Sequence, residues 1–138
     1  MSGEYVARLK KRAENFIREA KEAFDPNLAM FFVEQSLQLY VKAVYYELFG
    51  EKIRGHSIRS LLSFLYRSLE DNGFKEVSEK VRSFTDMFRE ELILAEEAYI
   101  ESRYGEISYS DKDVHRLLRV AEQLFNFLRE VENAVKLG

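Results

Sequence analysis

DPNLAMFFVEQSLQLYVKAVYYELF, residues 25–49, is the stretch of sequence that decides the fold. Asp25 can accept hydrogen bonds from the free N–H groups of a first helical turn, and Pro26 suits the next position because its missing N–H would be unpaired there anyway. Gly50 can end the helix. We therefore predict one helix of about 24 residues, roughly 36 Å long at about 1.5 Å per residue.

Polar side chains occupy only a narrow strip of this helix. At about 100° per residue, apolar side chains cover most of the remaining surface. A helix of this kind has to be wrapped by neighbours on several sides. We therefore predict that it is the central rod of a helical bundle and that its polar strip either faces water or lines a cleft. The strip consists of Asn27, Glu34, Gln35, Gln38 and Lys42.

The chain of 138 residues is 46% hydrophobic and 33% charged, which fits a single globular domain spanning residues 1–138. No apolar run approaches the roughly 20 residues of a membrane span, and residues 1–15 lack the apolar segment of a secretory signal. We therefore expect a cytoplasmic protein without a membrane partner. The absence of cysteine excludes disulfides and thiolate metal sites, and only two histidines are present.

The remaining helices are predicted from apolar residues that recur every three or four positions. The first runs from about Gly3 to Phe24, and its charged face is interpreted as a solvated surface. Ser57 caps the third, which ends before Asn72-Gly73. The expected fold is all-α, an up-and-down antiparallel bundle of four to five helices.

A long fourth helix is predicted over Phe74–Arg103, with a bend or break near Arg82-Ser83 because it outruns its neighbours. Ser110 starts the last helix, and the acidic side chains of Asp111 and Asp113 suit its first turn.

Aromatic side chains are numerous, with 11 Phe and 8 Tyr, and several fall outside the main apolar stripes. Exposed aromatic side chains in quantity usually mark an interface, so we expect a homodimer that buries part of the central or final helix. The residues concerned are Phe31, Tyr45, Phe49 and Phe127.

Three segments resemble the HEPN domain family: FFVEQSLQLYVKAVYYELFG (31–50), RGHSIRSLL (54–62) and ESRYGEISYSDKDVHRLLRVAEQLFNFL (101–128). The family pattern has a glutamine-rich Q-A-x-E-K-A-x-K-A helix, then T-H-D-L, then R-Y-P. The chain departs from it at Gln38, Leu39, Ser57 and Gly105, where the pattern has Glu, Lys, Asp and Pro. The matching residues are Gln35, Lys42, Ala43, His56, Arg103 and Tyr104.

The resemblance implies a helical bundle and one of two roles. Some HEPN proteins are metal-independent RNases with an Arg-x4–6-His motif, which is not present here because no arginine lies four to six residues before His56 or His115. Others accompany a separately encoded minimal nucleotidyltransferase and are proposed to bind nucleotide or substrate. We expect the second role, in a toxin–antitoxin-like pair, without cofactor or metal. An endoribonuclease using His56 and Arg103, and a dimeric scaffold without ligand, are the alternatives.

The expected ligand site contains Gln35, Gln38, Lys42, His56, Arg103 and Tyr104. The amides and the ammonium group could bind phosphate or base edges, Arg103 could bind phosphate through two hydrogen bonds, and Tyr104 could stack on a base. Each has a structural alternative: solvent exposure for Gln38 and Lys42, a turn position for His56, and a helix C-terminus for Arg103.

Other chemistries lack their motifs, because the sequence contains no glycine-rich phosphate loop, no H-E-x-x-H and no G-x-S-x-G. A di-metal site is also unsupported, since the paired Glu-x-x-His elements of such bundles are missing. The acidic residues of the predicted fourth helix are therefore interpreted as a solvated face. They are Glu90, Glu91, Glu96, Glu97 and Glu101.

Overall fold

The computed structural model describes residues 2–138, and this part of the chain is an all-helical bundle without a β-strand. The predicted all-α bundle is confirmed, although it has six helices rather than four or five. The helices are α1 (Ser2–Glu22), α2 (Pro26–Phe49), α3 (Ile58–Asp71), α4 (Lys75–Met87), α5 (Arg89–Tyr104) and α6 (Asp111–Leu137).

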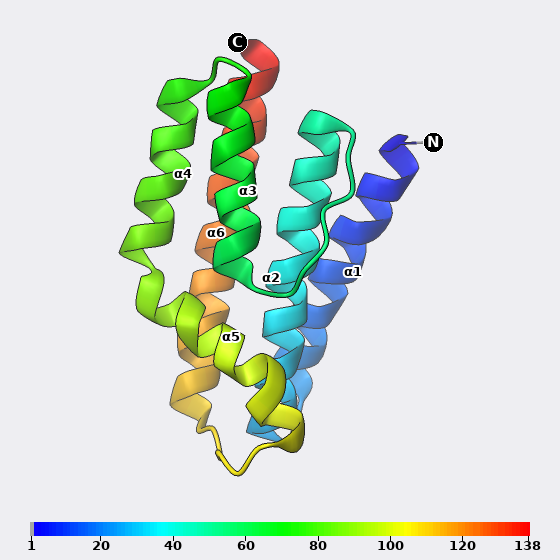
Figure 1. Ribbon diagram of the computed structural model, residues 1–138. Helices are drawn as coiled ribbons and strands as arrows, with labels where there is room; N and C mark the ends of the chain where they lie inside the picture. The colour runs from blue at the N-terminus through cyan, green and yellow to red at the C-terminus, as the bar shows by residue number, and fades with distance from the viewer. Residues whose placement is uncertain (1) are drawn as a thin grey trace.

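Helix α2 begins and ends where the sequence predicts. The Asp25 side chain accepts a hydrogen bond from the backbone N–H of Asn27 at 2.9 Å. Gly50 adopts a left-handed φ of 71° and donates its N–H to the carbonyl of Tyr46 at 2.8 Å, a conformation that glycine allows without strain. The helix lies in the middle of the bundle, with α1, α3, α5 and α6 around it (Figure 1).

Side-chain caps also fix the starts of α3 and α6. The hydroxyl of Ser57 accepts a hydrogen bond from Ser60 N–H at 3.3 Å. Ser110 and Asp113 form a reciprocal capping box, in which each side chain binds the other residue's backbone N–H. Both predicted helix starts are confirmed.

The connection between α2 and α3, residues 50–57, turns back along α2 instead of leaving the bundle at its end (Figure 1). Helix α3 therefore starts near the middle of α2, and it covers one half of α2 while α5 crosses the other half. His56 lies at the end of this connection, where α3 and α5 approach each other. The position of His56 beside α5 is thus a consequence of the returning connection.

The predicted fourth helix is divided, and the predicted position of the break is wrong. The chain changes direction at Phe88, with φ −104° and ψ 22°, rather than at Arg82-Ser83. Neither proline nor glycine causes this bend. The ring of Phe88 packs on Phe84, with centroids 4.6 Å apart, and Phe84 stacks on Phe127 of α6. An aromatic contact between α4 and α6 therefore accompanies the change of direction.

Helix α1 ends at Glu22, two residues earlier than predicted, and Phe24 is fully exposed instead of facing the core. Its charged face is not wholly solvated either. Lys10 Nζ lies 2.9 Å from both carboxylate oxygens of Glu132 and 3.0 Å from Glu47 Oε1. Burial raises the pKa of Glu132, whereas the hydrogen bond from Lys10 opposes that rise. One partly buried lysine therefore links α1 to α2 and α6.

The acidic side chains of the predicted fourth helix are also less solvated than expected. Glu96 accepts two hydrogen bonds from the guanidinium of Arg59, at 2.9 and 3.0 Å. Glu97 accepts the Tyr109 hydroxyl at 2.7 Å, and Glu91 pairs with Arg116 at 3.3 Å. These carboxylates connect α5 to α3, to the following loop and to α6.

The four aromatic residues expected at a dimer interface are engaged within the chain. Tyr45 is buried and its hydroxyl lies 2.7 Å from Ser68 Oγ. Phe49 packs on Tyr45, Phe127 stacks on Phe84, and Phe31 lies beneath the guanidinium of Arg103. Their exposure was therefore overestimated, and these four side chains do not by themselves identify a dimer interface.

Among residues 2–138, no helix combines the length and the apolar character that are needed to cross a bilayer.

Replacing Lys10 by methionine is expected to destabilise the fold, because two clustered carboxylates then lose their shared cation. Unpairing a fully buried ion costs about 3–5 kcal/mol, and we expect about 2 kcal/mol here since Lys10 is partly exposed. Urea denaturation measures the change. The matched control is Lys11→Met at the next, exposed position, with an effect within about 0.5 kcal/mol. Equal losses in both variants would contradict the assigned role of Lys10.

Candidate functional site

Glu34 is a fully buried carboxyl group on the polar strip of α2. Gln35 Nε2 donates to Glu34 Oε1 at 2.8 Å, and Gln38 Nε2 donates to Glu34 Oε2. Burial raises the pKa of Glu34 from 4.5 to about 7, against the opposing effects of both amides and of the charges on Arg103 and Lys42. Near neutral pH this carboxyl group therefore exchanges between its neutral and charged forms.

Lys42 lies about two turns after Glu34 on the same side of α2 and is half-buried. Burial lowers its pKa, while the carboxyl group of Glu34 raises it. The ammonium group is therefore close enough to Glu34 to interact electrostatically, although no ion pair joins them in the described part of the chain.

Arg103 projects from the last turn of α5 and is exposed. Its Nε and Nη2 atoms donate to the carbonyl of Tyr99 at 2.9 and 2.6 Å. The guanidinium carbon lies 4.8 Å from the ring centroid of Phe31, 4.7 Å from that of Tyr99 and 4.8 Å from that of Tyr104. Three aromatic rings and one carbonyl thus hold a positive charge at the surface.

His56 reaches this group through Tyr99. The imidazole stacks on the Tyr99 ring, with centroids 4.5 Å apart and an interplanar angle of 4°. Because Arg103 also contacts Tyr99, one aromatic ring links the returning connection to the end of α5. The imidazole is exposed, so its nitrogen atoms are accessible from solvent.

Asn27 holds the end of α5 and the following loop against the start of α2. Its Nδ2 donates to the carbonyl of Ile107 at 2.9 Å, and its Oδ1 accepts the backbone N–H of Tyr109 at 2.8 Å. Tyr109 is itself buried, and its hydroxyl donates to Glu97. These bonds position the C-terminal turn of α5 beside Phe31 on α2, which is how Arg103 comes to face the polar strip.

The six residues expected at a ligand site lie along one line of neighbouring groups. Gln35, Gln38 and Lys42 surround Glu34, whose charge interacts with Arg103, and Arg103 shares Tyr99 with His56. Tyr104 is 76% exposed and contacts Arg103.

The side-chain amides of Gln35 and Gln38 were expected to bind a ligand, but they are bonded within the chain. Gln38 is 7% exposed, and both glutamines donate to Glu34, so these donors are already used inside the chain. The exposed groups that remain for a ligand are the guanidinium of Arg103, the imidazole of His56 and the ring of Tyr104. Arg103 also has part of the structural role that was considered for it, because it donates to a carbonyl at the C-terminus of its own helix.

Three residues of this region were missed in the sequence. Glu34 stands one turn before Gln38 on the polar strip, and Tyr99 stands one turn before Arg103, so both could have been found from helical spacing. Phe31 carries no polar signal. Its proximity to Arg103 depends on the path of the loop after α5.

The buried carboxyl group gives the fold a specific pH dependence. With a pKa of about 7 in the folded state and an ordinary value of 4.5, Glu34 is neutral in the folded protein and charged in the unfolded chain between these values. Its contribution to stability is full below pH 4.5 and is lost as the pH rises to about 7. The loss amounts to about 3 kcal/mol.

We expect Glu34→Gln to remove this part of the pH dependence. The free energy of unfolding, measured by urea denaturation between pH 4.5 and 7.5, should fall less steeply in Glu34→Gln than in the wild type. Glu19→Gln, at an exposed position on α1, is the control and should keep the wild-type slope. An unchanged slope in Glu34→Gln would show that Glu34 is already charged in the folded protein.

Comparison with known proteins agrees with this architecture. The sequence matches the HEPN domain over residues 6–131, which is nearly the whole chain. No curated protein and no solved structure matches it. The matched region contains α2, the returning connection, α5 and most of α6, and therefore every residue of the candidate site. By the extent of this match, the chain belongs to the HEPN domain family.

Proposed function

We propose that this HEPN protein is a non-catalytic module that binds the phosphate group of a nucleotide or of RNA at the junction of α2, α5 and the returning connection. The observation that carries the proposal is the state of Arg103. Its guanidinium is exposed above three aromatic rings, and within residues 2–138 it forms no ion pair with a carboxylate. A preorganised guanidinium without a carboxylate partner suits a phosphate, which can accept the N–H groups that the Tyr99 carbonyl does not use.

Neighbouring groups supply the rest of such a site. The Tyr104 ring is exposed beside Arg103 and can stack on a base, and the His56 imidazole can donate a hydrogen bond to a second phosphate oxygen or to a sugar. Lys42 adds positive charge from α2. With its pKa raised to about 7, Glu34 is only partly ionised near neutral pH, so it repels phosphate less than a fully ionised carboxylate does.

The partner in this proposal is a separate minimal nucleotidyltransferase, in a toxin–antitoxin-like pair. Membership of the HEPN family supports this assignment, because the family includes companions of such enzymes. A homodimer is part of the same proposal.

ATP at millimolar concentration is expected to raise the melting temperature of the wild-type protein, since a ligand that binds only the folded state stabilises it. Arg103→Ala should weaken ATP binding about tenfold or more, as the loss of a charged hydrogen bond implies. Arg89→Ala removes an exposed arginine from the other end of α5 and serves as the control. A melting temperature that ATP leaves unchanged in the wild type would favour a scaffold without ligand.

A metal-independent endoribonuclease is the second candidate, and one observation favours it. His56 and Arg103 are separated by 47 positions in the sequence, yet both contact the ring of Tyr99. An imidazole for proton transfer and a guanidinium for phosphate are the groups that metal-free RNA cleavage needs. The sequence motif is absent, and the shared contact with Tyr99 is what supports a pair assembled in space.

Incubation with total RNA in the presence of EDTA tests this candidate. If the protein is a ribonuclease, His56→Ala should abolish cleavage, whereas His115→Ala, which changes the second histidine on α6, should leave it intact. We expect no cleavage by the wild type under the binding proposal. Cleavage lost in His56→Ala and in Arg103→Ala would replace that proposal by the enzymatic one.

A further inference from the structure

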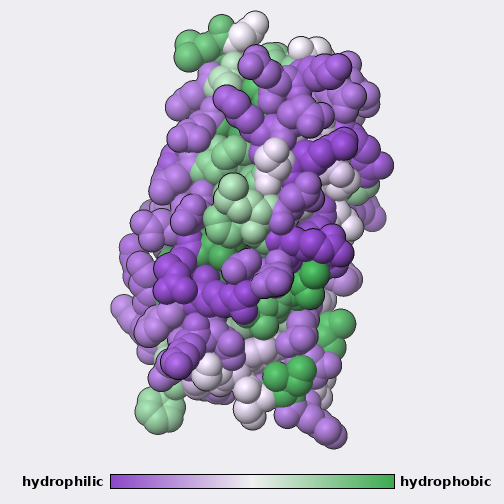
Figure 2. Space-filling view, turned by 90° about the vertical axis from the view of Figure 1, so that its left-hand side faces the viewer, coloured by the Kyte–Doolittle hydropathy of each residue, from purple (hydrophilic) through white to green (hydrophobic). Residues whose placement is uncertain are grey.

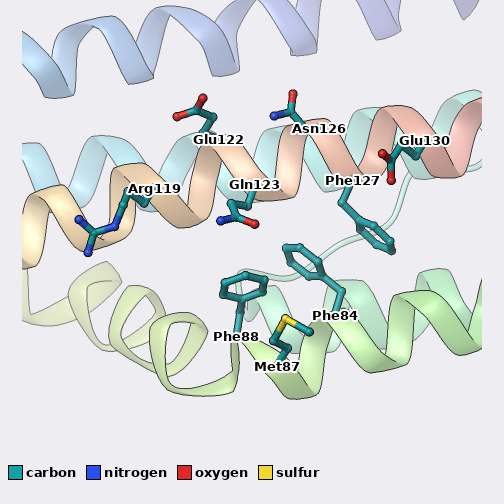
Figure 3. Close-up of a pocket in the computed structure, with 9 residues that line it drawn as sticks. All are labelled: Phe84, Met87, Phe88, Arg119, Glu122, Gln123, Asn126, Phe127 and Glu130. Atoms are coloured by element: carbon teal, nitrogen blue, oxygen red, sulfur yellow. The ribbon is translucent and has the colours of Figure 1, made fainter.

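An aromatic groove lies between α4 and α6, away from the candidate ligand site. Phe84 and Phe127 stack with centroids 4.7 Å apart, and Phe88 packs on Phe84 at 4.6 Å. The groove has a volume of about 500 Å³, and Met87, which is 74% exposed, stands at its edge. In Figure 3 the three phenylalanine side chains and Met87 lie between the two helices. Figure 2 shows hydrophobic surface in a hollow on this face, flanked by hydrophilic residues.

The surface of α6 beside the groove carries a line of exposed polar residues. Arg119, Gln123, Asn126 and Glu130 are spaced by four, three and four positions, so they follow one face of the helix. A positive charge stands at one end of this line, a negative charge stands at the other, and two amides lie between them. In the described chain neither Arg119 nor Glu130 has an ion-pair partner.

This line of residues is complementary to the same line on a second copy of α6 that runs in the opposite direction. An identical α6 lying antiparallel, with a two-fold axis between Leu124 and Phe125, brings Arg119 opposite Glu130 of the second copy. The same register brings Gln123 opposite Asn126 of the second copy. Asn126 Oδ1 already accepts a hydrogen bond from Arg129, and its Nδ2 group can donate to the side-chain carbonyl of Gln123. Both pairs occur twice, as a two-fold interface requires.

The same two-fold axis brings apolar surface onto apolar surface. When two such faces meet about an axis perpendicular to α6, the α4 side of one copy faces the α4 side of the other. Met87 lies beside the middle of the α6 line in Figure 3, so the Met87 side chains of both copies come together near the axis. Each exposed thioether can then pack on the phenylalanines of the facing groove.

We propose that the α4–α6 face is the docking surface for a second copy of this chain, packed with antiparallel α6 helices. The order of charges on α6 argues for a second copy as the partner. A partner must present an acidic and a basic side chain at the same separation and in reversed order, and an antiparallel α6 meets this condition. The interface uses Phe127, whereas Phe31, Tyr45 and Phe49 lie outside it. The ligand site on α2 and α5 stays open.

A charge exchange tests the proposed register. We expect the wild type to sediment as a dimer at micromolar concentration, and Arg119→Glu or Glu130→Arg to weaken dimerisation about tenfold or more, since like charges then face each other. The double variant Arg119→Glu/Glu130→Arg should restore the dimer. Arg18→Glu, at an exposed position on α1 away from this face, is the control. A monomeric wild type overturns the proposal, as does a dimer that none of these charge changes affects.

Two further measurements test the apolar half of the face. Met87→Asp should give a folded monomer, because this side chain is exposed in the single chain, whereas Phe24→Asp, at an exposed apolar position elsewhere, should leave the dimer intact. The chain contains no cysteine, so Gln123→Cys and Asn126→Cys can be mixed and oxidised. A disulfide between the two variants is expected, and equal homodimeric cross-linking of each variant alone would overturn the antiparallel register.

Discussion

The burial of α2 on nearly all sides is the constraint on which the rest of this structure depends. Its apolar side chains need neighbours around the whole helix, and no single helix can supply them. Helix α1 covers one side along its length, α6 covers another, and α3 and α5 share the remaining side. The returning connection and the bend at Phe88 make this division possible, since they place α3 and α5 against different halves of α2.

The polar strip of α2 is covered unevenly by these neighbouring helices. At its middle, Glu34 is fully buried and accepts hydrogen bonds from two glutamine amides of its own helix. Burial favours the neutral form of this carboxyl group, whereas the amides favour the charged form. At its edge, α5 brings Arg103 over the aromatic rings and leaves its guanidinium exposed. The buried carboxyl group and the exposed guanidinium are therefore two results of the same helix crossing.

Local chemistry was sufficient to predict both ends of α2 and the starts of α3 and α6, whereas tertiary contacts accompany several features that were not predicted. Asp25, Gly50, Ser57 and Ser110 act through backbone groups a few residues away, and each ends or starts a helix as expected. The bend at Phe88 accompanies packing against α6, and the pairing of Lys10 joins α1 to distant helices. The candidate residues were predicted together as one ligand site. The shared contact of His56 and Arg103 with Tyr99 was not predicted, because it depends on a connection whose path has no periodic signal.

The returning connection places an exposed side chain beside α5 and adds little to the packed core. Residues 50–57 form no regular element, and within them only Ile53 packs as a partly buried side chain against the core, while His56 projects to the surface. Replacement of the exposed His56 changes the group that stacks on Tyr99 without creating a void inside the bundle. The polar group beside Tyr99 can therefore change during evolution through a single short loop, while the packing of the bundle is kept.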